Sequence, residues 1–400
     1  MSDRAIAMFL MSDKWRATYW PGILVALVSV ATSMANFFLP VFFKSGLGFS
    51  GSEIGLLYAL FSMTTILAVI PVGLRNDRTS PRWLVAAGLT LISAAGFGMA
   101  SVKTFLPYLL VFLFYGLGIS AFRISIDTLM FKTGVRESAG EHWGTFNAFR
   151  MVGVGLGTVG AGYVLAAWGF PGGLRLLAGL ALGALAITPL LLPVKVGFPR
   201  LREYVEDLSA PGVLGFLLWL FLFSLHWGAE LTSYGLFLRE NLGLTLSGMG
   251  WYMAAEFLML TLTCLWAGPR SDRGLNQRRL AVAGLVISGF GQVLMCVPVL
   301  WFSLLARCVH GIGDGFIVIV TYLGIARLFD QTRVGGHNST VALFMMIGTF
   351  IGSLVFGPLG ASLGYQVPLI ATGVLVVVLA LPVRYAGMRT SDSSRARRNR

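Results

Sequence analysis

The chain has 400 residues, of which 56% are apolar and only 12% carry a charge, and its mean hydropathy is +0.78. A water-soluble core of this length cannot hide so much apolar surface, so the composition excludes a soluble globular protein and predicts one embedded in lipid. The net charge of +13 is also typical of nucleic-acid-binding proteins, but basic residues at the cytoplasmic face of a membrane explain the same excess, and we expect no nucleic-acid partner.

Twelve apolar segments are long enough to cross a bilayer, whose hydrocarbon core needs about 20 helical residues. In the first half of the chain we expect helices at 20–42, 52–74, 82–102, 105–131, 143–168 and 172–193. In the second half we expect them at 212–238, 248–267, 279–298, 301–326, 340–361 and 366–386. The sequence therefore predicts an all-α, polytopic membrane protein with twelve transmembrane helices.

A Gly-x-Arg-x-Asp-Arg string follows the second predicted helix, at 73–78, and recurs 195 residues later, at 268–273. Many glycines keep the same offset, and small residues at matching depths let helices pack closely, so the offset predicts two pseudo-symmetric six-helix bundles. We expect an N-terminal bundle over 1–194, a cytoplasmic linker over 195–210, a C-terminal bundle over 211–386 and a basic cytoplasmic tail over 387–400.

Most of the 30 Lys and Arg residues fall in the termini and in alternate loops, and only Lys44, Lys103, Arg175 and Arg239 fall in the opposite loops. The positive-inside rule therefore places both termini in the cytoplasm. No cleavable signal sequence is expected, because residues 1–19 are mixed and charged and the first apolar run is long enough to span. We expect a multi-pass protein of the cell (inner or plasma) membrane.

This organisation resembles the major facilitator superfamily over almost the whole chain. The residues that match its two loop signatures are Gly73, Asp77, Arg78, Gly268, Asp272 and Arg273. In the first copy, Ser80 and Pro81 stand where a glycine and a basic residue are usual. The resemblance implies a transporter that is functional as a monomer. It also implies that the signature forms a latch that stabilises the outward-open state, in which an aspartate accepts hydrogen bonds from a helix N-terminus. The alternative is that these charges only end two helices.

Ionisable side chains also occur inside the predicted helices, where a bilayer makes a charge costly by a few kcal/mol. They are Arg123, Asp127, Arg150, His226, Glu230, Glu256, Arg307, His310 and Asp314. His226 and Glu230 are four residues apart, and so are His310 and Asp314, which places each pair on one helical face. We expect all of these groups to face a water-filled cavity or one another.

Burial strengthens proton binding by carboxylates, and histidine titrates near neutrality, so such groups suit the loading and release of a proton. The residues that we expect to couple protons are Glu256, His310, Asp314, Glu230, His226 and Asp127. The alternative is a set of static internal ion pairs.

Several of these positions resemble the lactose-permease-like branch of the superfamily, which includes phenylpropionate-type and nucleoside:proton permeases. Arg150 is similar to the helix-5 arginine that binds substrate in that branch, Glu256 to its helix-8 glutamate, and His310 to its helix-10 histidine. The helix-9 arginine of that branch has no counterpart, because residues 288–292 contain no cation. Arg307 either replaces it or snorkels to the outer surface.

Arg123 and Asp127 are four residues apart near the cytoplasmic end of helix 4, where they form either a private ion pair or part of a gate. A candidate substrate site is expected from charged, amide and phenol side chains of several helices. Its residues are Arg150, Glu256, Asn147, Asn36, Tyr234 and Tyr322.

The function that these residues favour is secondary active transport of a small organic solute by alternating access, with proton symport as the coupling mode. A proton-driven exporter of drugs or metabolites stays open, because glycines on helix 5 resemble an antiporter motif, and so does a lipid or lysolipid flippase. We expect the partners to be a small-molecule substrate, protons and the bilayer.

Enzyme activity is not expected, since His310 and Asp314 lack a serine or cysteine nucleophile at a recognisable elbow. The sequence shows no metal-ligand spacing and no disulfide framework, and we expect no cofactor.

Overall fold

The computed structural model describes residues 12–13, 15–194 and 196–385, and within these ranges it contains helices and no strand. The side chain of Asn36 and the tail over 387–400 lie outside the described residues. The first half consists of α2 (Trp20–Val41), α3 (Gly51–Arg78), α4 (Pro81–Ser101), α5 (Phe105–Thr133) and α6 (Ala139–Ala184). The second half consists of α8 (Val213–Ala229), α9 (Leu246–Asp272), α10 (Gln277–Leu294), α11 (Leu300–Leu328), α12 (Val334–Leu363), α13 (Gln366–Val378) and α14 (Ala380–Tyr385).

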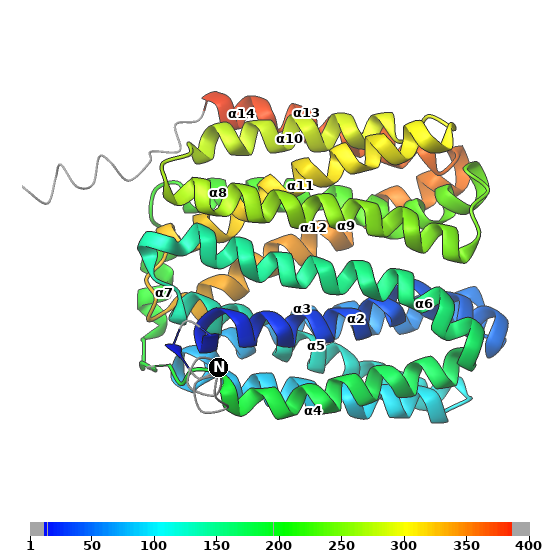
Figure 1. The fold of residues 1–400 in the computed structure, drawn as a ribbon, viewed down its shortest axis with the longest axis horizontal. Coiled ribbons are helices and arrows are strands. Elements are labelled where there is room, and N and C mark those ends of the chain that lie inside the picture. The colour runs from blue at the N-terminus through cyan, green and yellow to red at the C-terminus, as the bar shows by residue number, and fades with distance from the viewer. Residues whose placement is uncertain (1–11, 14, 195, 386–400) are drawn as a thin grey trace, which may run out of the picture.

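Some of these helices are compound. α6 contains two spans joined at Gly169, whose φ of 64° and ψ of 179° are open to glycine and costly for other residues. α8 continues through the π-helical stretches Glu230–Tyr234 and Phe237–Asn241. Nine segments of the described chain are long and apolar enough to span a bilayer, and α2, α10 and the α13–α14 pair run beside them (Figure 1). The predicted all-α polytopic fold is confirmed.

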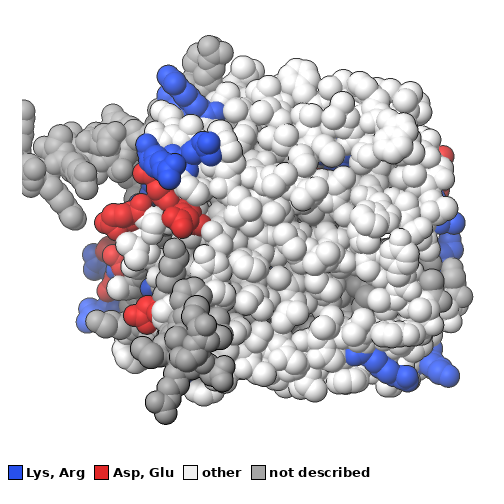
Figure 2. Space-filling view, in the orientation of Figure 1, with Lys and Arg blue, Asp and Glu red and all other residues white. Residues whose placement is uncertain are grey.

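The helices run side by side along one direction, with α2 to α6 in one half of the molecule and α8 to α14 in the other (Figure 1). Charged side chains gather mainly at the two ends and leave a broad uncharged band between them (Figure 2). Such a band is the surface that hydrocarbon tails require. The short linker helix α7 (Leu201–Leu208) lies at one end of the bundle.

The halves meet through two pairs of helices that the 195-residue offset relates. α6 of the first half packs along α9 of the second, and α12 of the second half packs along α3 of the first. The same relation holds inside each half, where α2 packs on α6 and α8 packs on α12. The repeat found in the sequence is therefore a repeat of helix contacts.

The helices were predicted too short at the end of the molecule that carries the two signature strings. The expected helices ended at 74 and 267, but α3 runs to Arg78 and α9 to Asp272, so both signature strings lie mostly in helices and not in loops. The helices expected to begin at 143 and 340 begin at Ala139 and Val334. Hydropathy marks where a helix leaves the apolar layer, whereas polar residues and capping contacts extend the helix beyond that layer.

Candidate functional site

The first signature aspartate joins the two halves. The buried carboxylate of Asp77 in α3 accepts hydrogen bonds from the backbone N–H groups of Gly335, at 2.9 Å, and Gly336, at 2.8 Å, in the first turn of α12. Lys132 Nζ lies 3.1 Å from the same carboxylate. An anion at a helix N-terminus satisfies unpaired N–H groups and is favoured by the helix dipole.

The second signature aspartate repeats this contact in the opposite sense. Asp272 in α9 accepts hydrogen bonds from the backbone N–H groups of Gly140, at 2.7 Å, and Glu141, at 2.8 Å, at the start of α6. Each donor stands 195 residues before its counterpart in α12. Both aspartates thus connect one half to the other, and do more than end their own helices.

The signature glycines lie where these helices cross. A Cβ atom on Gly73 would meet the Ser339 side chain and the Gly335 carbonyl oxygen, and one on Gly268 would meet the backbone of Gly140 and Gly144. A side chain larger than hydrogen would therefore push the halves apart at this end of the molecule, which we call the signature end.

The arginines of the signature are peripheral by comparison. Arg78 is exposed and its Nη2 lies 3.5 Å from the Pro199 carbonyl oxygen in the linker, and Arg273 is exposed at the end of α9. Their positions agree with the positive-inside rule. The short contacts between the two halves come from the signature aspartates and glycines.

The linker helix α7 contacts both helices of the first of these crossings, α3 and α12, and we call this set of contacts the strap. The Tyr204 hydroxyl donates to Asp77 at 2.9 Å. Asp207 accepts from Arg333 Nε at 2.7 Å and lies 2.8 Å from His337 Nε2, both at the start of α12. Arg333 also pairs with Glu203 at 3.2 Å. The sequence predicted a linker here but not its partners, which lie more than a hundred residues away.

A pH dependence follows for this strap. Burial alone raises the pKa of Asp207, but hydrogen bonds from Arg333 and His337 outweigh it, so the pKa lies below its ordinary value. A depressed pKa contributes stability that is present above the ordinary value of about 3.9 and is lost as pH falls through the lowered value. We expect the melting temperature of the purified protein to fall in that acidic window, and Asp207→Asn to flatten this part of the profile.

The matched control is Glu206→Gln on the same helix, because among the described residues Glu206 pairs only with the exposed Arg202. This variant should keep the wild-type profile. Equal acid sensitivity of wild type and Asp207→Asn would show that Asp207 does not strap the crossing.

A charged cluster in the first half surrounds Arg150 of α6. Its guanidinium pairs with Asp127 of α5 and donates to Asn147 Oδ1 at 3.2 Å and to the Tyr322 hydroxyl at 2.6 Å. The Tyr322 hydroxyl in turn donates to Asp127 at 3.2 Å. Because Tyr322 belongs to α11, this cluster spans the interface between the halves.

The alternative of a private ion pair between Arg123 and Asp127 is wrong. Asp127 pairs with Arg150, while Arg123 is exposed. Residues four apart share a helical face only approximately, and the neighbouring helix supplies a better-placed cation.

Aromatic rings complete the surroundings of Arg150, and the sequence reasoning missed two of them. The guanidinium carbon lies 4.8 Å from the Phe146 ring centroid. Trp143 stacks on Tyr322 with centroids 4.0 Å apart. Neither ring carries a charge, so only their spacing from Arg150 on one helix, at four and seven residues, could have indicated them.

A second cluster in the second half is built on Arg307 of α11, which is 2% exposed. Its guanidinium pairs with Glu230 and, at 2.6 Å, with Glu256 of α9, and it lies 4.1 Å from the ring centroid of Tyr234. The alternative of a snorkelling Arg307 is wrong, because two inward carboxylates hold the side chain inside. Arg307 instead supplies the cation that residues 288–292 lack.

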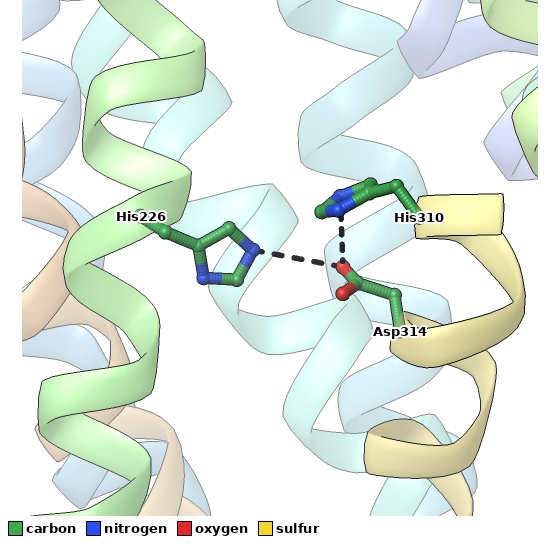
Figure 3. Close-up of side chains that lie close together, drawn as sticks. All are labelled: His226, His310 and Asp314. Carbon is green, nitrogen blue, oxygen red and sulfur yellow. Dashed lines mark ion pairs between the residues drawn. The ribbon is translucent and has the colours of Figure 1, made fainter. Parts of the chain in front are cut away.

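Two histidines and Asp314 extend this cluster. Nε2 of His310 lies 3.4 Å from Glu230, 3.7 Å from Asp314 and 3.9 Å from Glu256. Nε2 of His226 in α8 approaches the same Asp314 oxygen at 3.6 Å, so both rings point at one carboxylate (Figure 3).

Neutral side chains that the sequence reasoning missed hold Asp314 in place. Ser288 donates to Oδ1 at 2.6 Å, and Trp227 Nε1 lies 3.4 Å from Oδ2. They carry no charge, and a sequence without coordinates gives no signal for them.

The predicted substrate-binding and proton-coupling residues thus form two groups. Asp127, Asn147, Arg150 and Tyr322 lie in the interface cluster, and the remaining charged residues lie in the cluster around Arg307. Among the described side chains, no ion pair joins the two groups. Tyr234 packs on Arg307, and its buried hydroxyl has no hydrogen-bond partner.

Comparison with known proteins adds the family. A model described as Major Facilitator Superfamily matches residues 22–237 and 216–399. An uncharacterized MFS-type transporter of Methanocaldococcus jannaschii is 23% identical over 367 residues, which cover 86% of this chain and 92% of that protein.

Three solved structures share the fold. The human organic anion transporter MFSD10 has a TM-score of 0.77 at 14% identity, over 92% of this chain and 99% of that one. The E. coli fucose:proton symporter FucP has a TM-score of 0.69 at 14% identity, over 92% and 97%. A bacterial homologue of the iron transporter ferroportin, in an outward-facing state, has a TM-score of 0.71 at 15% identity, over 92% and 98%.

Proposed function

The chain belongs to the major facilitator superfamily of membrane transporters, and from this premise we propose that it moves a small organic solute by alternating access in symport with protons. The observation that carries the proposal is the buried network of Glu230, Arg307 and Glu256, which α11 shares with α9 and the end of α8. Two carboxylates that share one guanidinium are not balanced when both are ionised, so one of them is a natural proton acceptor.

The proton steps belong to the second cluster. Glu256 binds and releases the coupled proton, His310 and Asp314 link that event to the rest of the cluster, and Glu230 and His226 relay the proton. A change of protonation at Glu256 alters its attraction to Arg307, and a rearranged ion pair inside a low-dielectric interior is a strong driving force for helix movement. Asp127 contributes by balancing the positive charge of Arg150 and releases it when it binds a proton.

The solute binds at the interface cluster. Arg150 offers N–H donors between the halves, and Tyr322 and Asn147 add polar groups beside it. Because Asp127 already balances the guanidinium, a hydroxylated solute can bind by hydrogen bonds alone, and an anionic one by displacing Asp127. Names of relatives with this fold agree with both classes, since one is a fucose:proton symporter and another an organic anion transporter.

The signature end is the gate in this proposal. Asp77 and Asp272 hold the halves together there, with Gly73 and Gly268 at the crossings, and these contacts break when that end opens. Both termini lie on the cytoplasmic side. The linker over 195–210, which connects the bundles over 1–194 and 211–386, lies on the same side. The active form is a monomer.

The glycines in the first span of α6, which left an exporter open as an alternative, have a packing explanation. A Cβ atom on Gly153 would meet the backbone of Ala26, and one on Gly157 the backbone of Val30, both in α2. They are therefore needed for close contact inside the first bundle, and this packing role explains them without an exporter.

A ligand screen tests the binding half of the proposal. Sugars, nucleosides, aromatic acids and other small hydroxylated or anionic solutes are added to the purified protein while its melting temperature is measured. We expect one class to stabilise the protein, and Arg150→Lys to weaken that binding at least about tenfold, because lysine cannot keep the fork of contacts to Asp127 and Tyr322. The exposed Arg175→Lys is the matched control. Undiminished binding in Arg150→Lys would remove Arg150 from the site.

A further inference from the structure

Three side chains in the second cluster aim their free ligand atoms at one point. Nε2 of His226, Nε2 of His310 and a carboxylate oxygen of Asp314 all lie within 4.8 Å of one another, and all three side chains are buried (Figure 3). They come from two helices, α8 and α11, so their spacing in the sequence is not that of a metal-binding motif.

Both Nε2 atoms can act as acceptors when their rings are neutral. Nδ1 of His226 lies within hydrogen-bond distance of the Phe223 carbonyl oxygen, and Nδ1 of His310 lies 2.9 Å from the Ser288 carbonyl oxygen. A carbonyl oxygen only accepts, so each neutral ring carries its proton on Nδ1 and leaves a lone pair on Nε2. Both Nε2 atoms are buried, and among the described residues neither has a hydrogen-bond partner. A lone pair that is buried and unpaired is costly unless a cation meets it.

The net negative charge of the cluster favours the binding of such a cation. Glu230, Glu256 and Asp314 supply three carboxylates, whereas Arg307 is the one guanidinium that pairs with them among the described residues. With both imidazoles neutral, two negative charges stay uncompensated in a site that water reaches poorly. One divalent ion balances them.

We propose that His226, His310 and Asp314 form a binding site for a divalent transition-metal ion of the zinc type. Two imidazoles and one carboxylate, with a fourth position left to water or substrate, are a donor set that zinc and its neighbours in the first transition row prefer over magnesium or calcium.

The observed geometry is close to that of a loaded site. Zinc–nitrogen bonds of about 2.0–2.1 Å in a tetrahedron place neighbouring ligand atoms about 3.3–3.4 Å apart. The two Nε2 atoms lie 3.6 and 3.7 Å from the Asp314 oxygen, a few tenths of an ångström beyond that spacing, and the three ligand atoms all lie within 4.8 Å of one another.

The surroundings orient these ligands. The backbone carbonyls that accept from Nδ1 are the outer partners that metal-binding imidazoles ordinarily have, and Ser288 holds the other oxygen of Asp314 at 2.6 Å. Trp227 Nε1, 3.4 Å from the ligand oxygen, competes weakly with the ion. Glu230 lies 3.4 Å from His310 but is held by Arg307, so the ion has three protein ligands.

This inference does not rest on proton symport. A bound ion and protonated imidazoles exclude each other, yet metal binding is measured without any flux. Failure of the metal site leaves the role of Glu256 untouched, and failure of symport leaves the metal site untouched.

The test uses the full-length protein purified in detergent, stripped with a chelator and titrated with Zn²⁺ and Co²⁺. We expect one equivalent of metal to bind, a Co²⁺ absorption spectrum of four-coordinate type, and a metal-dependent rise in melting temperature. His226→Gln and Asp314→Asn should each weaken binding more than about 100-fold, beyond the range for loss of an outer partner. His142→Gln is the matched control, because both ring nitrogens of this buried histidine are already bonded, to Thr18 and to Met130.

A variant that retains binding guards against unfolding. His226→Cys replaces one ligand by a thiolate, and its Co²⁺ complex should gain a thiolate-to-cobalt charge-transfer band that the wild type lacks. No tight metal binding by wild type, binding that survives both His226→Gln and Asp314→Asn, or an unchanged Co²⁺ spectrum in His226→Cys would each overturn the proposal.

Discussion

Glu256→Gln is expected to abolish uphill accumulation of the solute in vesicles while exchange and binding persist. The amide keeps the size of the side chain and can still accept a hydrogen bond from Arg307, which now lies 2.6 Å from the carboxylate. It cannot gain or lose a proton, so solute movement is no longer tied to the proton gradient. Gradient-driven uptake should fall at least about 100-fold, the lower range for removal of a proton-transferring side chain.

The matched control for this variant is Glu240→Gln. Glu240 is an exposed carboxylate in the π-helical stretch Phe237–Asn241 that continues α8. We expect its replacement to leave accumulation unchanged. Wild-type accumulation in Glu256→Gln would remove Glu256 from the coupling step. Loss of exchange together with accumulation would indicate that this side chain serves folding or solute binding instead.

Gly73→Ala is expected to shift the protein away from the state in which the signature end is closed. The added methyl group meets Ser339 and the Gly335 carbonyl oxygen, and overpacking of this kind costs about 1–3 kcal/mol. The cost falls only on the closed state, so the equilibrium should move about 5- to 150-fold toward opening at this end. Distances between spin labels on α3 and α12 report the change.

Two further variants make this experiment specific. Gly268→Ala at the equivalent crossing should produce the same shift, because its Cβ meets the Gly140 backbone. Gly55→Ala, in the same helix as Gly73 but with nothing within 4 Å of its Cβ, should leave the distances unchanged. Identical distance distributions in wild type and Gly73→Ala would contradict the role of the crossing as a gate.

The sequence was sufficient for the fold because two of its patterns follow directly from physics. The lipid phase requires long apolar helices, and the 195-residue offset of glycines and signatures requires two halves that pack alike. It was also sufficient to select Asp77 and Asp272, because their strings resemble the superfamily's loop signature and an aspartate can accept hydrogen bonds from the N-terminus of a neighbouring helix.

The partners were beyond the reach of the sequence. Asp77 and Asp272 accept hydrogen bonds from the backbone N–H groups of Gly335, Gly336, Gly140 and Glu141, and backbone donors carry no residue-specific signal. Their position also depends on helix starts that hydropathy placed several residues late.

The charged clusters were predicted as a set but not as pairs. Counting residues along a helix gives the depth and face of a side chain, not which neighbouring helix offers the opposite charge. Asp127 therefore pairs with Arg150, and Arg307 turns inward between Glu230 and Glu256. The Tyr322 hydroxyl that bridges the halves was one of several polar candidates until the packing of α11 against α5 and α6 was known.

The most direct test of symport follows protons and solute together. Vesicles containing the protein are suspended in weakly buffered medium without an imposed gradient, and the solute selected by the binding screen is added outside. We expect the external medium to become more alkaline as solute enters, and Glu256→Gln to abolish that change. Acidification of the medium, or solute entry into wild-type vesicles with no change in pH, would contradict coupling by proton symport.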